Sequence, residues 1–188
     1  EDLLISLADT RAKDLYVKQL DSLSALEDYG LGTQAAILKL GLQALGTYED
    51  QESHDAACHV GIAMTIALLL RGTRHHARRQ KLYIPKDIAS TYKLSPGSVA
   101  KGEPTQALSK CVYEMAMLAK EHLDLAAAKK IPPESLPALY PAAIPRLVIA
   151  KLETVQYDIM HPDWNSMSSF MKLRLPLLLL QNRMLGKF

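Results

Sequence analysis

The stretch PTQALSKCVYEMAMLAKEHLDLA, residues 104–126, decides the fold class of this chain. Apolar side chains recur in it at every third or fourth position, which is the spacing of one face of an α-helix. That stripe consists of Ala107, Leu108, Cys111, Val112, Met115, Leu118, Ala119, His122, Leu123 and Ala126. Pro104 suits a first helical turn, and Pro132 with Pro133 suits the region beyond the last one. The stretch therefore predicts a long helix with one buried face.

The segments on either side have the same helical periodicity. Alternating strand patterns are scarce, and aromatic residues make up only 6% of the chain. Gly30, Gly32 and Pro176 are expected to kink or interrupt the helices that contain them. Residues 71–92 are interpreted as an elaborated connection that includes one short helix. The expected helices cover residues 21–45, about 51–72, 86–92, about 142–160 and 166–185. The sequence thus predicts an all-α fold.

Length and composition favour one globular domain over residues 1–188, because 48% of the chain is hydrophobic and 22% is charged. The formal net charge is only +2, so attraction to nucleic acid or anionic lipid requires a local patch. Cys58 and Cys111 lie far apart, which argues against a zinc cluster or a disulfide framework. The longest uncharged apolar stretches, residues 56–70 and 175–182, are shorter than the ~20 residues that cross a bilayer. No transmembrane span is predicted.

Residues 71–85 read RGTRHHARRQKLYIP. This stretch resembles the second signature of the squalene/phytoene synthase family, whose pattern is roughly Leu-Arg-Asp-x-x-x-Asp-Ala-x-x-Gly-Arg-x-Tyr-Leu-Pro. The residues in matching positions are Arg71, Ala77, Arg78, Tyr83 and Pro85. The two aspartates of the family pattern fall on Gly72 and His76. The resemblance implies an isoprenoid-synthase-like helical bundle, of which this chain would be the C-terminal two thirds.

The resemblance also carries a functional expectation, because two acidic motifs of that family hold the Mg²⁺ ions that bind and ionise a prenyl diphosphate. Such a motif needs carboxylates four residues apart, on one face of a helix. Glycine offers no ligand, and imidazole is a poor ligand for Mg²⁺. None of the 20 Asp and Glu residues is spaced i, i+4 from another, and the second acidic motif of the family lies upstream of the matched region. We therefore expect a pseudoenzyme with no catalytic residue, metal or cofactor, whose degenerate metal positions are Gly72 and His76.

A second set of matches is similar to the mitochondrial complex I assembly factor branch of this superfamily. Tyr29 is followed by Thr33-Gln34, residues 78–88 read RRQKLYIPKDI, and residues 155–162 read VQYDIMHP. That branch is regarded as non-catalytic, so the resemblance implies an inactive scaffold or assembly factor with protein partners in a mitochondrial complex. The implied location is the matrix, with or without peripheral contact to the inner membrane. Because the sequence begins at Glu1 without an initiator Met, a removed targeting segment is one expectation.

Two alternative functions stay open at this point. The first is an accessory subunit or assembly factor of another large mitochondrial particle, such as the mitoribosome. The second is an isoprenoid- or lipid-binding module, or a residual prenyltransferase. An enzyme with newly recruited ligands would draw them from Glu114, Glu121 and His122 on the helix of residues 104–126. His54 and His59 are five residues apart instead of four, so a metal site there is disfavoured.

Six residues of the segment 71–81 form a predicted binding surface: Arg71, Arg74, His75, Arg78, Arg79 and Lys81. The segment contains no acid, so its positive charges repel one another. An acidic partner, or a phosphate of a lipid headgroup or an RNA, would relieve this repulsion. A solvated turn explains the same charges equally well. Tyr83 alone is available for base stacking, which weakens the case for sequence-specific RNA recognition. The late apolar run at residues 173–180 either lies on a membrane surface, with Arg174 and Arg183 beside it, or forms a buried terminal helix.

Overall fold

A computed structural model describes residues 2–188, apart from the side chains at positions 165, 167 and 168. The predicted all-α class is confirmed: residues 2–188 contain helices and no β-strand, with one isolated bridge between Gln19 and Leu82. The main helices are α1 (Asp2–Asp14), α2 (Leu23–Gly30), α3 (Ala36–Ala44), α4 (Gln51–Ala77), α5 (Lys86–Thr91), α6 (Pro96–Lys101), α7 (Gln106–Ala127), α8 (Leu136–Leu139), α9 (Ala143–Thr154) and α10 (Met167–Leu185). The π-helix η1 (Leu31–Ala35) joins α2 to α3.

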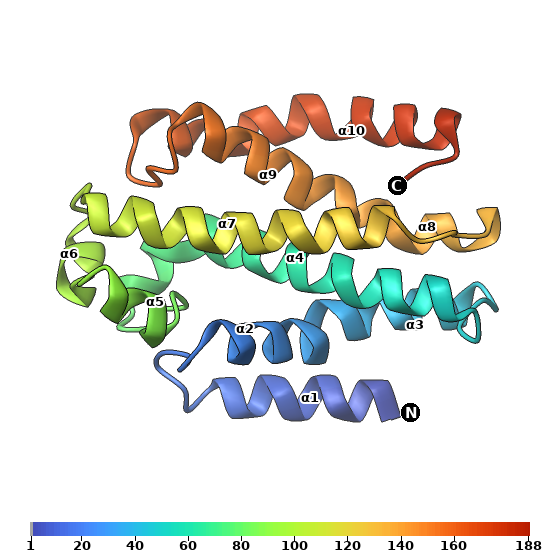
Figure 1. The fold of residues 1–188 in the computed structure, drawn as a ribbon, viewed down its shortest axis with the longest axis horizontal. Helices are drawn as coiled ribbons and strands as arrows, with labels where there is room; N and C mark the ends of the chain where they lie inside the picture. Colours follow the sequence, from blue (N-terminus) through green and yellow to red (C-terminus); the bar gives the residue numbers. More distant parts are fainter. Residues whose placement is uncertain (1) are drawn as a thin grey trace.

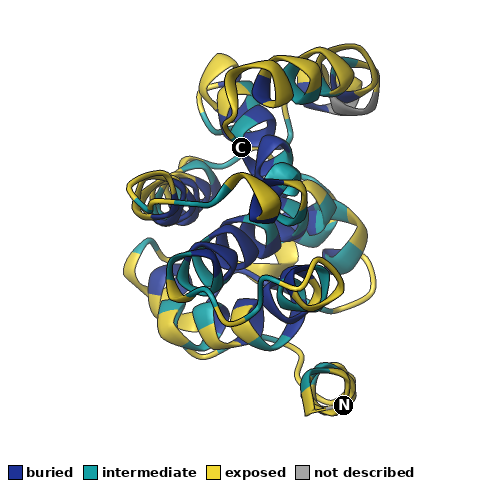
Figure 2. Cartoon of the chain, turned by 90° about the vertical axis from the view of Figure 1, so that its right-hand side faces the viewer, coloured by how far each residue is buried: buried dark blue, intermediate teal, exposed yellow. Residues whose placement is uncertain are grey.

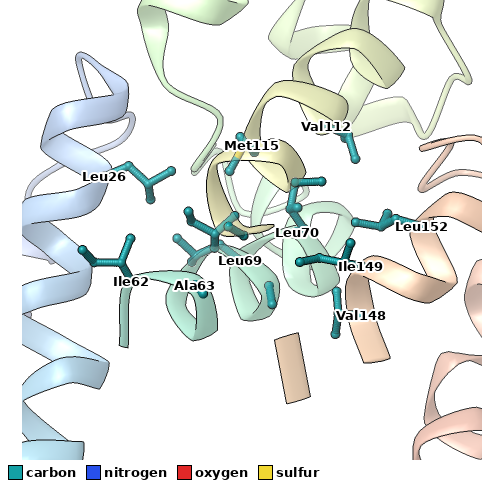
Figure 3. Packing of buried hydrophobic residues seen from close by; sticks show 14 of the residues in the cluster. Leu26, Ile62, Ala63, Leu69, Leu70, Val112, Met115, Val148, Ile149 and Leu152 are labelled. Atoms are coloured by element: carbon teal, nitrogen blue, oxygen red, sulfur yellow. The ribbon is translucent and has the colours of Figure 1, made fainter. Parts of the chain in front are cut away.

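Helix α4 is the centre of the bundle, because it packs against α2, η1, α3, α7 and α9. Its sequence is apolar on nearly all sides, as a helix in the middle of a core requires. Figure 3 shows Leu70 of α4 between Met115 of α7 and Ile149 of α9. The helix begins cleanly, since the Asp50 carboxylate accepts a hydrogen bond from the Ser53 backbone N–H at 2.8 Å.

Among the described residues, α4 is the one helix whose length and composition would suit a membrane span. In the fold, however, 67% of its most apolar window is buried against other helices. A core helix satisfies the same length and hydropathy criteria. Its apolar character is therefore explained by its central position in the bundle.

Helices α1 and α10 form the two outer layers, on opposite sides of the helices that surround α4 (Figures 1 and 2). Helix α1 has no buried residue, and it packs on α3 and η1. Helix α10 packs on α9 and exposes its opposite side to solvent. These two helices thus depend on fewer apolar contacts than the inner ones.

The end of α4 differs from the prediction, which placed it at Arg71-Gly72. The helix continues to Ala77, because the buried face of α4 extends through Thr73 and Ala77. The Thr73 hydroxyl donates to the Leu69 carbonyl at 3.0 Å within this last part. The basic residues of the last turns also lie at the negative end of the helix dipole, which favours them there. The predicted connection is therefore shorter and begins after Ala77.

The expected kink at Gly30 and Gly32 is a π-helix, η1, in an otherwise continuous path from α2 to α3. Both glycines allow close packing: a Cβ on Gly30 would lie 3.0 Å from the Cα of Ile62, and one on Gly32 would overlap Thr10 of α1. The helix expected over residues 21–45 is thus three elements. The two glycines are explained by the neighbours they approach.

Other boundaries are corrected as well. Helices α1 and α6 were not predicted, and α9 ends at Thr154 instead of about residue 160. The chain turns there because Gln156 and Tyr157 adopt positive φ angles of 51° and 60°. Helix α10 runs through Pro176 without interruption. The helices predicted for residues 104–126 and 86–92 are confirmed as α7 and α5, to within a few residues at each end.

We predict that Gly61→Ala destabilises the fold by at least about 2 kcal/mol, because its Cβ would overlap the backbone of Ala35 in η1, which cannot move aside as a side chain can. The measurement is the free energy of unfolding in urea. Gly97→Ala is the matched control, since the nearest atom to its Cβ would be the Ser95 Oγ at 3.5 Å. Equal effects of the two substitutions would show that the contact between α4 and η1 is not tight.

Candidate functional site

The two degenerate metal positions lie on one face of α4, because Gly72 and His76 are four residues apart in its last turns. The helix expected from the sequence ended at Gly72 and left His76 in the connection, so the shared face is a finding of the structure. The His76 ring leans over Gly72, so that a Cβ on Gly72 would lie only 2.7 Å from the His76 Nε2. The imidazole thus occupies the space that a side chain at position 72 would need.

A cavity of about 250 Å³ opens beside His76. It lies between α1, α2, η1, α4 and the segment after α4. The polar residues that line it are Arg11, Asp14, Tyr29, Thr33, Gln34, Thr65, His76 and Tyr83. Leu68 and Leu69 supply its apolar wall. The cavity contains one carboxylate, so its chemistry depends on what holds that group.

Asp14 is the carboxylate of this cavity, and three side chains surround it. The hydroxyls of Tyr83 and Tyr29 donate to its Oδ2 at 2.8 and 3.3 Å, and the Lys81 ammonium lies 2.9 Å from its Oδ1. The Lys81 ammonium also donates to the Asp14 backbone carbonyl. Arg11 donates to the Tyr29 hydroxyl at 2.6 Å. The interactions of the Asp14 carboxylate therefore attach α1 to the rest of the fold.

The titratable groups of the cavity hold their protons in ways that suit this structural role. Burial, followed by the nearby Asp14 charge, raises the pKa of Tyr29 to about 12. Burial, followed by the hydrogen bond to Asp14, also raises the pKa of Tyr83. Burial is the main cause that lowers the pKa of His76, and the neighbouring His75 and Lys81 act in the same direction. At neutral pH both tyrosines are therefore hydrogen-bond donors and His76 is neutral.

Within the described residues, no group of three or more His, Cys, Asp and Glu side chains is placed to hold a metal ion. The nearest arrangement is a chain of three groups that links α2, α4 and α7. His122 Nε2 lies 3.0 Å from Glu27 Oε1, and His122 Nδ1 lies 2.9 Å from His59 Nδ1. His122 is a buried, hydrogen-bonded core residue, which is one of the two interpretations drawn from the sequence.

The hypothesis of newly recruited ligands is not supported by where its three residues lie. Glu121 and Glu114 line an open groove of about 630 Å³ on the outer side of α7. Glu114 accepts a hydrogen bond from the Tyr92 hydroxyl at 2.6 Å. His122 does not line this groove, and its ring contacts Glu27 of α2 and His59 of α4. The fold thus separates the histidine from the two glutamates.

The six residues of the predicted binding surface do not stay together. Arg71, His75, Arg78 and Arg79 are exposed at the end of α4, where Arg79 lies 2.6 Å from His75 Nε2. Lys81 turns inward to Asp14 and also lies over the Tyr83 ring. Arg74 is half-buried against Gly102 of the segment after α6. Of the six residues, only Arg71, His75, Arg78 and Arg79 are exposed to solvent. We call these four residues the α4 basic surface.

Sequence reasoning missed three residues of the cavity: the carboxylate Asp14, its partner Tyr29, and Arg11, which donates to Tyr29. Asp14 and Tyr83 are 69 positions apart, so no local spacing connects them. Tyr29 and Tyr83 each stood inside a stretch quoted for the resemblance, but no pattern showed that both would point at one carboxylate. The one available signal was an Asp at the end of a segment with helical composition before residue 21.

The chain belongs to the squalene/phytoene synthase family, whose sequence pattern matches residues 1–177. Among solved structures, squalene synthase HpnC from Alicyclobacillus acidocaldarius is similar with a TM-score of 0.76, over 84% of this chain and 60% of that chain. The sequence identity is 14%, so this likeness concerns the fold. It confirms the expected isoprenoid-synthase-like bundle.

Relatives of known name are similar over most of the chain. The human protein named NADH dehydrogenase (ubiquinone) complex I, assembly factor 6, is 29% identical over 174 residues, which are 92% of this chain and 52% of that protein. The homolog of that name from Dictyostelium discoideum is 30% identical over 158 residues, which are 82% of this chain and 44% of that protein. The chain therefore spans about half the length of these relatives.

We predict that the effect of Gly72→Ala on stability depends on His76. With His76 present, the new Cβ at position 72 displaces the His76 ring from its contact with the Tyr83 ring. The loss of this contact offsets the helix preference for Ala, so the substitution gives no net stabilisation. In a His76→Ala background the same change should stabilise the protein by about 0.5–1 kcal/mol, the usual preference for Ala over Gly inside a helix. A double-mutant cycle from urea unfolding measures the coupling. Identical effects in both backgrounds would contradict the placement of the ring over Gly72.

Proposed function

We propose that this chain is a non-catalytic member of the squalene/phytoene synthase family that acts in mitochondria as an assembly factor for respiratory complex I. The relatives that carry this role in their names match 82% to 92% of the chain. They favour complex I over another mitochondrial particle. The observation that carries the proposal is the replacement of both family aspartates by Gly72 and His76 beside the cavity.

The cavity supports the non-catalytic part of the proposal. Ionisation of a prenyl diphosphate needs Mg²⁺ bridged to carboxylates, and hard cations select oxygen ligands. The cavity offers a single carboxylate, Asp14, and Lys81 and two tyrosines already engage it. The charged groups that line it, Arg11 and Asp14, serve the attachment of α1. A fold that has lost its catalytic residues still has surfaces that recognise partners.

Two such surfaces are proposed as contact sites. The α4 basic surface would bind an acidic face of a protein partner, because its four residues are exposed and no acid lies within residues 71–81. The outer side of α10 would lie on the inner membrane. Leu173, Leu177, Leu180 and Met184 recur there at helical spacing, and each is more than half exposed.

The charge of α10 fits an anionic bilayer. Its sequence contains Lys172, Arg174 and Arg183 but neither Asp nor Glu. All three cations are exposed, and the spacing places Arg174 on one side of the apolar stripe and the other two on its opposite side. This is the pattern of helices that lie in a membrane interface, where long basic side chains reach the headgroups.

We predict that the protein releases no diphosphate from farnesyl or geranylgeranyl diphosphate in the presence of Mg²⁺, because the metal positions lack carboxylates. The measurement is a coupled assay for diphosphate against a protein-free background. The double substitution Gly72→Asp/His76→Asp should also be inactive, since the family's other acidic motif is not in this sequence. Turnover by the unmodified protein that stops on chelation of Mg²⁺ would refute the proposal.

We predict that Leu173→Ser/Leu177→Ser/Leu180→Ser weakens binding to vesicles of phosphatidylcholine and phosphatidylglycerol by about tenfold or more, because it removes most of the apolar stripe that would enter the interface. The measurement is co-sedimentation at physiological salt. These side chains are exposed, so the thermal midpoint should hardly change.

The matched control for that experiment removes charge at the other surface. Arg71→Gln/Arg78→Gln/Arg79→Gln should retain vesicle binding but should recover less of the complex I assembly intermediates from solubilised mitochondria. Full vesicle binding by the α10 variant would remove the membrane contact from the proposal. Full recovery of intermediates by the arginine variant would identify the α4 basic surface as a solvated helix end.

A further inference from the structure

We call the cavity beside His76 the α4 cavity. A second cavity, of about 530 Å³, is lined by residues from the later part of the chain. It forms where the C-terminal end of α10 meets the start of α9 and the segment that follows α7. Figure 1 shows the chain end turning back from α10 toward α8 at this place. Its apolar walls come from Ile131, Leu136, Leu178, Leu185 and Phe188. Its volume is in the range of sites that enclose small organic ligands.

The polar lining of this cavity consists of cations and amides. Lys129, Arg146 and Lys187 line it together with Gln181 and Asn182, and its lining contains no Asp or Glu. Lys129 is balanced by Asp55, whose Oδ2 lies 3.0 Å from its ammonium. Arg146 and Lys187 take part in none of the ion pairs formed by the described residues. The cavity therefore carries an excess of positive charge.

Two of these groups are buried donors without a protein partner. The Asn182 side chain is among the buried polar groups of the fold, with 8% of its surface exposed, and its Nδ2 makes no hydrogen bond. The Nε of Arg146 is likewise buried and unbonded. Buried donors in proteins are almost always satisfied, and leaving a charged one unmet is costly. Both residues line a cavity whose lining contains no Asp or Glu, and the described residues offer these two donors no acceptor.

We propose that this cavity binds an amphipathic anion, a carboxylate or phosphate group attached to an aliphatic chain, such as a fatty acid or a lysophospholipid. The anionic head would accept from Arg146 and Asn182, and a guanidinium is suited to carboxylate and phosphate oxygens. The chain would lie against Leu178, Leu185 and Phe188. This site goes beyond the assembly role proposed above and does not depend on it.

The test compares ligands that share one half of this chemistry. Oleate and oleoyl lysophosphatidylglycerol are titrated below their critical micelle concentrations by isothermal calorimetry, beside oleyl alcohol and inorganic phosphate. At least one of the two amphipathic anions should bind about tenfold or more tightly than the alcohol and the phosphate. Equal binding of oleyl alcohol would reduce the site to an apolar cleft. Equal binding of inorganic phosphate would reduce it to an anion site, and either result overturns the proposal.

Substitutions of the two buried donors test whether they are responsible for anion binding. Asn182→Leu keeps the branched shape of the side chain but removes the unbonded amide, so it should hardly change the thermal midpoint while weakening anion binding by about tenfold. Arg146→Gln should weaken anion binding by a similar factor. Arg183→Gln is the control, because Arg183 is an exposed neighbour on α10 that does not line the cavity. Anion binding that is unchanged in both the Asn182 and Arg146 variants would refute the site.

Discussion

The contact between Gly61 of α4 and Ala35 of η1 is the constraint on which the arrangement of this bundle depends. A Cβ at position 61 would overlap the backbone of Ala35, so the two helical segments are as close as glycine permits. Gly30 makes a similar approach to Ile62. With the backbones this close, Thr33 and Thr65 come within 3.5 Å of each other across the same contact. The central helix is thereby fixed against α2 and η1, and the other helices pack around it.

The α4 cavity lies directly beside this contact, and its polar groups have a mechanical function in the fold. Helix α1 has no buried residue, so apolar packing alone holds it weakly. Its attachment instead uses Thr10 against Gly32, Arg11 on Tyr29, and Asp14 on Lys81 and Tyr83. Asp14, which lines the same cavity as His76, thus joins the first helix to the bundle.

Positive charge is distributed unevenly over the chain, although the net charge is only +2. One concentration of it is the α4 basic surface, at the negative end of the α4 dipole. Another is α10 together with the neighbouring cavity around Arg146. Figure 1 shows the end of α4 near α5 and α6, away from the chain terminus, where residues 185–188 line the cavity that contains Arg146.

The sequence by itself determined the helical class, the α7 stripe and the family. These features depend on spacings of three to seven residues or on a contiguous motif, which can be read without knowing what lies nearby. The tertiary structure decided how far α4 extends, since its last turns are helical only because Thr73 and Ala77 remain buried. It also decided that Lys81 leaves the predicted surface for Asp14.

Only the tertiary structure could place the partners that are distant in sequence. Asp14 meets Tyr83 across 69 positions, and His122 meets Glu27 across 95. The second cavity likewise combines Arg146 of α9 with Asn182 of α10, two residues that carry no motif. The run at residues 173–180 suited either a buried helix or a membrane face, and the packing of α10 on α9 leaves one side of this run partly buried and the other exposed. Such outcomes depend on which helix faces a segment, and the local order of residues does not encode that.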